Sequence, residues 1–178
     1  MIYIATPAQM FGAMINPPKP MGDFSLESAN GSVSLSEFRG KLVVIYFGYT
    51  ACPDVCPTTL ANLRQALELL DEQQARQVQI LFISVDWNRD NPTKVTDYAH
   101  AFNPNFVGLT GSQEQIDTVT RQFGIFYLIN PADANGFYSV DHTASTSVLD
   151  RQGNLTALWS YGMPPSEIAS DMRNLLRK

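Results

Sequence analysis

Two apolar runs in the first half of the chain have the length and composition of buried β-strands. Residues 41–48 are rich in β-branched and aromatic side chains, and residues 79–86 repeat this pattern. Such continuous apolar runs are typical of strands that are covered on both faces. Between them, Pro57 suits the first turn of a helix, and leucines then recur at helical spacing at Leu60, Leu63, Leu67 and Leu70. The pattern therefore predicts a strand, a loop, a helix and a second strand.

The remainder of the chain changes from helical spacing to short strand-like segments. Helices are predicted over residues 92–102 and 112–123, the second with Ser112 as its N-cap. Turn signals then separate four strand-like segments, at residues 124–129, 136–140, 144–149 and 155–161. A final helix is predicted over residues 164–176. Strands that alternate with helices and are later paired by hairpins predict an α/β fold with a mixed central sheet flanked by helices on both faces.

The N-terminal part follows neither pattern. Residues 1–21 contain four prolines without a hydrophobic period and predict an irregular arm. We expect one globular domain over residues 22–178, with an added β-hairpin over residues 24–35 around Asn30-Gly31. The arm carries Met10, Met14 and Met21, but without a tight Met-x-Met array these residues are expected to fill gaps in packing.

Composition excludes some classes of partner. The chain has 178 residues, is 44% apolar and carries a net charge of −5, so it can bury a core but would repel nucleic acid. No apolar run approaches the roughly 20 residues that cross a bilayer, and residues 1–22 lack the regions of a signal peptide. The chain as given is expected to be soluble, and an anchor or signal before residue 1 is left open.

The chemistry centres on Cys52 and Cys56, the only cysteines of the chain, together with a distant His142. Two sulfurs and an imidazole form a donor set that suits copper. Cysteines four positions apart lie on one side of a helical turn, where they can share an ion or form a disulfide. Two cysteines are too few for a disulfide framework. The alternative is a pair of buried cysteines that act as small apolar residues.

The ligand count favours copper over zinc. Three protein ligands, two of them thiolates, satisfy cuprous ion, whereas structural zinc requires a fourth donor, which Asp141 or Asp54 could supply. Cupric ion beside two thiolates can oxidise them, so metal occupancy and thiol redox state should be coupled. The start of the helix is expected to lower the pKa values of the cysteines through its N–H groups and dipole.

Other polar residues are interpreted as structural or solvated. His100 lies on a predicted helix without another soft donor nearby, and His142 taken alone could be a hydrogen-bonded residue before a strand. Asp86 and Asp90 resemble a pair of catalytic carboxylates, but no substrate motif accompanies them. We interpret them as residues that organise a turn near the site.

Three segments together resemble the Sco/SenC family: the run Gly48 to Pro57 with its Cys-Pro-Asp-Val-Cys-Pro sequence, Ser84-Val85-Asp86 followed by Arg89-Asp90, and Asp141-His142-Thr143. The resemblance spans residues 22–178. Trp87 and Asn88 depart from it, because the family usually has a proline and an acidic residue there. The family resemblance implies a thioredoxin-like fold and one copper ion, Cu(I) or Cu(II), bound by Cys52, Cys56 and His142.

The resemblance also implies a function. Sco/SenC proteins act as copper metallochaperones for the binuclear copper centre of cytochrome c oxidase, so the copper-site subunit of the oxidase is the expected partner. Another copper chaperone or a thioredoxin-like reductant is a second expected partner. The resemblance places the domain on the periplasmic side of the inner membrane behind an N-terminal tether.

Two other functions compete with metal delivery. Cys52 and Cys56 could be a redox-active pair of a thiol:disulfide oxidoreductase that reduces the cysteines of the oxidase copper site. Whether the protein is an enzyme in this sense is left open. A peroxidase is disfavoured, because the sequence lacks the Thr-x-x-Cys motif that peroxiredoxins combine with a nearby arginine.

Overall fold

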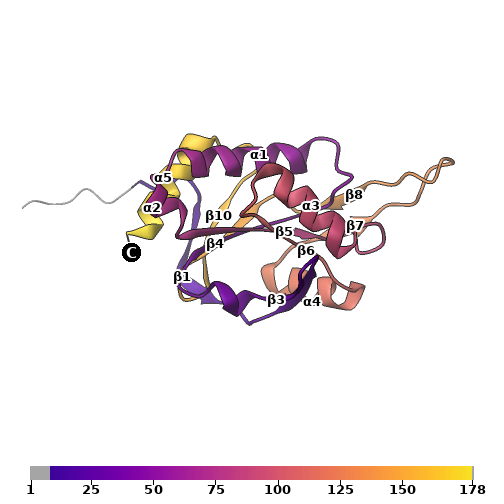
Figure 1. Cartoon of the computed structure of the whole chain (residues 1–178), viewed down its shortest axis with the longest axis horizontal. Helices are drawn as coiled ribbons and strands as arrows, with labels where there is room; N and C mark the ends of the chain where they lie inside the picture. Colours follow the sequence, from indigo (N-terminus) through magenta and orange to yellow (C-terminus); the bar gives the residue numbers. More distant parts are fainter. Residues whose placement is uncertain (1–8, 178) are drawn as a thin grey trace, which may run out of the picture.

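A six-stranded mixed sheet forms the centre of the protein (Figure 1). The computed structural model describes residues 9–177. In spatial order the strands are β1 (Ala13–Pro20), β10 (Asn154–Trp159), β9 (Thr146–Leu149), β4 (Leu42–Gly48), β5 (Val78–Ser84) and β6 (Val107–Leu109). β4, β5 and β6 are parallel, and the other neighbours are antiparallel. The mixed sheet that the sequence predicts is confirmed.

Helices cover both faces of this sheet. On one face, at the top of Figure 1, lie α1 (Val55–Glu68), α3 (Pro92–Phe102), α5 (Pro165–Leu176) and the short helix α2 (Glu72–Ala75). On the other face lie α4 (Gln113–Phe123), the hairpin of β2 (Ser25–Ser28) and β3 (Gly31–Ser34), and the 3-10 helix η1 (Leu35–Phe38). Within residues 9–177, no helix combines the length and apolar character that crossing a membrane requires.

Local sequence signals explain where the helices begin. Asn91 caps α3 by accepting a hydrogen bond from the Lys94 N–H, and Ser112 caps α4 in the same way. Pro57 lies in the first turn of its helix, as predicted, since α1 begins at Val55. Pro57 is tolerated in this first turn because its missing N–H would have no partner within the helix.

The N-terminal segment differs from the irregular arm that the sequence predicts. Residues 13–20 form the edge strand β1, which pairs with β10 through two short stretches separated by a register shift between Met14 and Lys19. Pro17 and Pro18 lie within this shift, where a missing N–H costs no sheet hydrogen bond. The interruption hides the strand from a periodicity analysis. Met21 follows β1 and is buried in the core, as expected of a residue that fills a gap.

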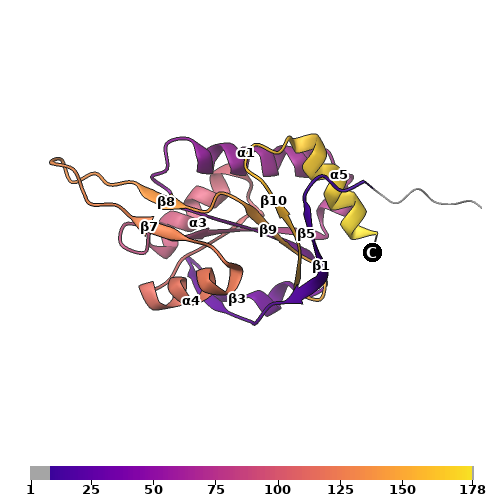
Figure 2. The same cartoon turned by 180° about the vertical axis from the view of Figure 1, so that it is seen from behind.

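A second hairpin projects from the sheet, as Figure 2 shows from behind. It pairs β7 (Tyr127–Ile129) with β8 (Val140–His142) through three residue pairs, and Tyr127 lies opposite His142. The sequence predicts the second strand at residues 136–140, but this strand begins only at Val140. Asp133 accepts backbone hydrogen bonds from Asn135 and Phe137, so that part of the predicted strand forms a turn. His142 therefore ends a strand instead of preceding one.

Candidate metal centre

Two sulfurs and one imidazole converge beyond the carboxyl end of the central strand β4. The ligand atoms of Cys52, Cys56 and His142 all lie within 4.8 Å of one another, and Cys56 Sγ is 3.5 Å from His142 Nε2. Metal bonds to nitrogen and sulfur of about 2.0–2.3 Å, the values for zinc, separate the donors of a trigonal site by about 3.5–4 Å. A shift below about 1 Å would therefore let all three donors contact one ion.

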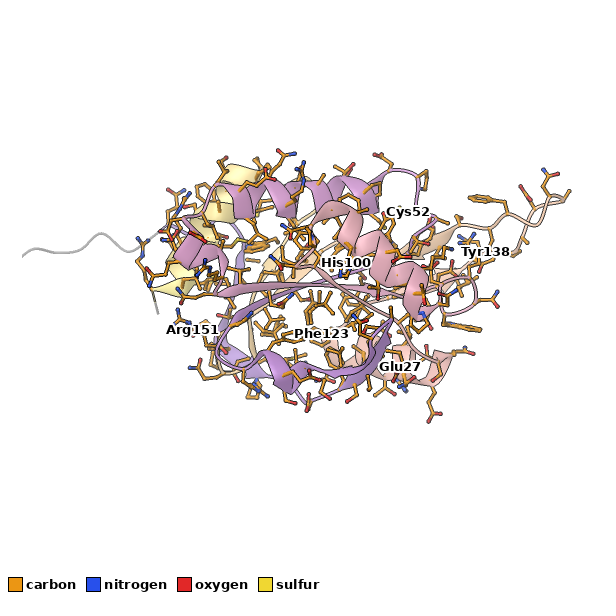
Figure 3. The ribbon with its side chains drawn as sticks, in the orientation of Figure 1. Glu27, Cys52, His100, Phe123, Tyr138 and Arg151 are labelled. Atoms are coloured by element: carbon orange, nitrogen blue, oxygen red, sulfur yellow. The ribbon has the colours of Figure 1, made fainter. Side chains whose placement is uncertain are left out.

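The two cysteines are held differently by the strand-to-helix turn. Cys56 lies in the first turn of α1 and is fully buried, whereas Cys52 lies in the preceding loop and is half-buried. The backbone N–H of Cys56 donates a hydrogen bond to Cys52 Sγ at 3.4 Å. An N–H at the helix start is thus aimed at a cysteine sulfur, as the sequence predicts. Figure 3 shows Cys52 at the end of the molecule from which the β7–β8 hairpin projects.

The imidazole of His142 is fixed in the orientation that metal binding requires. Its Nδ1 lies 3.0 Å from the carbonyl oxygen of Thr143, which can only accept, so Nδ1 carries the proton and the lone pair of Nε2 faces Cys56. The ring meets Tyr46 and Tyr49 edge to face, with centroids at 6.1 and 5.9 Å. Burial lowers the pKa of His142, which keeps the ring neutral at physiological pH.

The expected lowering of the cysteine pKa values is wrong for Cys56. Burial raises the pKa of its thiol to about 12, because removal of the thiolate from water outweighs the hydrogen bonds made to it. One of these bonds comes from the Tyr46 hydroxyl, 3.6 Å from Cys56 Sγ. The metal-free protein therefore holds Cys56 as a thiol, and a metal ion must displace its proton on binding.

The other candidate ligands lie outside this cluster. Asp54 and Asp141 are exposed, and among the residues described no carboxylate joins the two cysteines and His142 in a group of metal-ligating atoms. Asp54 instead accepts a hydrogen bond from the Thr58 hydroxyl one turn later. His100 is exposed on α3, which confirms its interpretation as a solvated residue (Figure 3).

Asp86 and Asp90 organise the turn that follows β5, as interpreted from the sequence. The backbone oxygen of Asp86 accepts from the N–H groups of Arg89 and Asp90. The buried Asp90 carboxylate accepts from the Ser84 hydroxyl at 2.6 Å and from both the N–H and the hydroxyl of Thr50. Burial alone would raise the pKa of Asp90, but these bonds and the ion pair with Lys94 at 2.9 Å together lower it. Asp90 therefore anchors the cysteine loop as a carboxylate.

The sequence analysis assigned no role at the site to three residues that surround it. Tyr46 and Tyr49 contact His142, and Gly48 lies beside Cys56. The strand pattern identifies Tyr46 and Gly48 as parts of a buried run, but nothing in that run shows which elements cover it. The only available signal was their position directly before the cysteine loop.

An open pocket of about 350 Å³ lies over the site. Its lining residues are Tyr49, Cys52, Pro53, Asp54, Val55, Val140, Asp141, His142 and Ala144. The sulfur of Cys52 and the imidazole thus border a space that a partner protein can enter, while Cys56 lies beneath it. The arrangement can bind a soft ion or exchange a disulfide at the surface.

Fold and site together define a thioredoxin-like α/β protein with a surface site of two thiols and one imidazole. Residues 12–177 match the SCO1/SenC family, and the chain belongs to this family. An SCO2-like protein of Rickettsia felis is 38% identical over 149 residues, which cover 83% of this chain and 72% of that protein.

Solved structures of Sco proteins have the same architecture. Apo Sco1 from Thermus thermophilus is 42% identical, with a TM-score of 0.81 over 94% of this chain and 95% of that one. ScoI from Bradyrhizobium japonicum, solved with copper bound, is 35% identical, with a TM-score of 0.79 over 88% of this chain and 99% of that one. A member of the Sco family has thus been solved with copper bound.

Two more distant structures share the fold. BsSco, described as a member of the Sco family of cytochrome c oxidase assembly proteins with a disulfide switch, is 21% identical, with a TM-score of 0.67 over 90% of this chain and 95% of that one. The thioredoxin domain of a thiol-disulfide oxidoreductase from Bacteroides vulgatus is 16% identical, with a TM-score of 0.64 over 91% of this chain and 99% of that one. The predicted thioredoxin-like fold is confirmed.

Proposed function

We propose that this protein binds one copper ion through Cys52, Cys56 and His142 and carries it to the binuclear copper centre of cytochrome c oxidase. The observation that carries the proposal is the convergence of the three donor atoms within 4.8 Å. The copper bound to a relative with 35% identity supports the choice of metal. The open pocket above Cys52 and His142 supports transfer to a partner, because a carrier must present its ion at the surface.

The donor set can hold copper in both oxidation states. Two thiolates satisfy most of the coordination of cuprous ion, and a neutral imidazole completes a trigonal site without adding charge. Cupric ion prefers more donors and relies more strongly on the imidazole nitrogen. We therefore expect the loss of His142 to weaken cupric binding more than cuprous binding.

Copper titration of the reduced protein tests this proposal. We expect about one copper ion per chain, and His142→Ala should weaken cupric binding by more than the roughly 10- to 100-fold that loss of an outer partner of a ligand costs. His100→Ala is the matched control, since His100 is exposed on α3 and outside the site. Equal cupric affinity in the wild type and in His142→Ala would remove the histidine from the site.

Thiol exchange is the second candidate function, favoured by the different exposure of the two cysteines. In this reaction the Cys52 thiolate attacks one sulfur of an oxidised partner, and the partner's other sulfur leaves as a thiolate. Cys56 then loses its proton and attacks Cys52 Sγ, which releases the partner's first sulfur. The partner gains two electrons, and Cys52 and Cys56 end as a disulfide.

A reconstitution experiment separates the two functions. The copper-loaded protein and the reduced metal-free protein are mixed separately with a metal-free copper domain of the oxidase, with its cysteines either reduced or oxidised. A carrier restores the copper spectrum of the reduced domain only when it is copper-loaded. A reductase converts the oxidised domain to thiols while metal-free, and Cys52→Ser and Cys56→Ser both abolish that conversion.

We further propose a location and partners for this activity. The domain acts on the periplasmic side of the inner membrane behind an N-terminal tether, and it receives copper or electrons from another copper chaperone or a thioredoxin-like reductant. Relatives occupy comparable settings: one from Bacillus anthracis is described as a lipoprotein and one from Bos taurus as mitochondrial. Fractionation of cells that produce the full-length protein tests the location.

A further inference from the structure

The half-buried Arg89 lies at the centre of a cluster beside the metal centre. Its Nε donates to the fully buried carboxylate of Asp86 at 2.5 Å, and its Nη1 donates to the backbone oxygen of Tyr138 at 2.9 Å. The guanidinium carbon also lies 3.5 Å from the centroid of the Tyr138 ring. A planar guanidinium can make all these contacts at once, whereas a lysine ammonium could not.

Tyr138 closes this cluster from the hairpin. Its hydroxyl donates to Asp86 Oδ1 at 2.7 Å and accepts from Asn88 Nδ2 at 3.3 Å. The side chain is buried, although the preceding residues 131–137 of the hairpin are all exposed. Figure 3 shows Tyr138 where the hairpin leaves the body of the protein. Four residues later the same chain segment delivers His142 to the metal centre.

The turn that carries Arg89 also anchors the loop that contains Cys52. Asp90 binds the N–H and hydroxyl of Thr50, two residues before Cys52. The guanidinium carbon of Arg89 lies 5.8 Å from the centroid of the Tyr49 ring, and this ring contacts His142. Residues 86–90 therefore contact both the cysteine loop and the segment that leads to the histidine.

We propose that Arg89 is a positioning residue that, with Asp86 and Tyr138, clamps the histidine-bearing strand β8 against the cysteine loop and so sets the preference of the site between the two oxidation states of copper. This inference rests on the proposed function for its copper readout. Release of the clamp leaves the two sulfurs together on the α1 turn but frees the imidazole. Cupric affinity then falls while cuprous affinity is kept.

Two variants test the clamp without a collapse of the fold. Arg89→Gln alone leaves the buried Asp86 charge unpaired, so the double variant Asp86→Asn with Arg89→Gln replaces the ion pair by two neutral amides. Tyr138→Phe keeps the ring and removes only the hydroxyl. Arg64→Gln is the matched control, because it breaks an exposed ion pair with Glu68 on α1 away from the site.

The cupric and the cuprous affinity are measured for each variant that keeps the circular dichroism spectrum and cooperative unfolding of the wild type. We expect the double variant to lose cupric affinity by about 10- to 100-fold, the usual cost of an outer partner of a ligand. Its cuprous affinity should change by less than about 3-fold. Tyr138→Phe should have a smaller effect in the same direction, and Arg64→Gln none.

Hydrogen exchange in the metal-free protein provides a readout that does not depend on copper. Backbone amides at residues 138–143 should lose protection in the double variant, while those of α1 should not. Unchanged exchange at residues 138–143 would overturn the clamp, and so would equal losses of cupric and cuprous affinity. A wild-type protein that binds no copper would contradict the proposed function, and the exchange measurement would still decide whether the clamp exists.

Discussion

Gly48, the last residue of β4, lies directly against Cys56: a Cβ added to this glycine would come within 2.8 Å of Cys56 Sγ. It would also meet the rings of Phe82 and Tyr46 at 3.0 and 3.1 Å. Rotation of the Cys56 side chain would relieve only the first of these contacts, because the other two are made by the rings of Phe82 and Tyr46. The absence of a side chain at residue 48 is thus a condition for the position of the buried sulfur.

Gly48→Ala should therefore disturb both folding and metal binding. Overpacking of this kind costs about 1–3 kcal/mol of unfolding free energy, and displacement of the sulfur should lower copper affinity. Urea denaturation and copper titration measure the two effects. Gly22→Ala is the control, because its added Cβ would meet only the flexible end of Gln122, at 3.3 Å. Wild-type stability and affinity in Gly48→Ala would contradict the close approach.

The two cysteines should differ in reactivity. Cys56 is fully buried and burial raises the pKa of its thiol to about 12, whereas Cys52 is half-buried and borders the pocket. Limiting iodoacetamide at pH 8 should label Cys52 at least about 10-fold faster than Cys56 in the reduced, metal-free protein, because the thiolate is the reacting form. Both cysteines lie in the tryptic peptide 42–64, so fragmentation of this peptide by tandem mass spectrometry measures the ratio. Similar rates would show that Cys56 is accessible in solution.

Asp90 should make the stability of the protein depend on pH in the acid range. Its hydrogen bonds lower its pKa in the folded protein below the ordinary value of 3.8, so the carboxylate stabilises the fold above that value. This stabilisation is lost as the pH falls through the lowered pKa. Asp90→Asn should cost about 1–3 kcal/mol at pH 7 and less at pH 2.

Urea denaturation at pH 7 and pH 2 measures both costs. The control is Asp97→Asn, which changes an exposed carboxylate on α3. If Asp90→Asn cost as much at pH 2 as at pH 7, the carboxylate charge would not be what anchors Thr50.

Asp171 should anchor the backbone of Phe11 and Gly12, directly before β1, to the domain. Its fully buried carboxylate accepts from the N–H groups of Phe11 and Gly12, both at 2.8 Å, and from Trp159 Nε1 at 3.0 Å. Asp171→Ala leaves these three donors without their partner and should cost roughly 3 kcal/mol or more of unfolding free energy. Urea denaturation measures the loss, and Glu167→Ala on α5 is the control. Copper stoichiometry should not change, because the carboxylate has no contact with the metal centre.

Local patterns in the sequence determined most of the elements of this fold. The buried runs at β4 and β5 were recognisable because a strand covered on both faces must be apolar throughout. The predicted bounds of α3 agree with the observed ones, and the cap of α4 was recognisable because Ser112 acts on an N–H group three residues away. The family motifs likewise lie within short segments of the chain.

Sequence reasoning failed where the outcome depends on distant segments. β1 forms because it pairs with β10, which is distant in the sequence. β6 has only three residues, which are too few for a hydrophobic period to be visible. The start of β8 depends on the turn that Asp133 makes with Phe137. The helix start does aim an N–H at Cys52, but the pKa of Cys56 is decided by the strands and rings that bury it.

The sequence by itself thus determined which atoms can bind a soft metal ion, because donor chemistry belongs to individual side chains. Only the tertiary structure decided that Cys56 and His142, which are 86 residues apart, lie with Sγ and Nε2 at 3.5 Å. It also decided the orientation of the imidazole, through Thr143, and the hydrogen bond from Arg89 to the backbone oxygen of Tyr138. The physical reason is that burial and long-range hydrogen bonding, which fix these positions, depend on which parts of the chain meet in space.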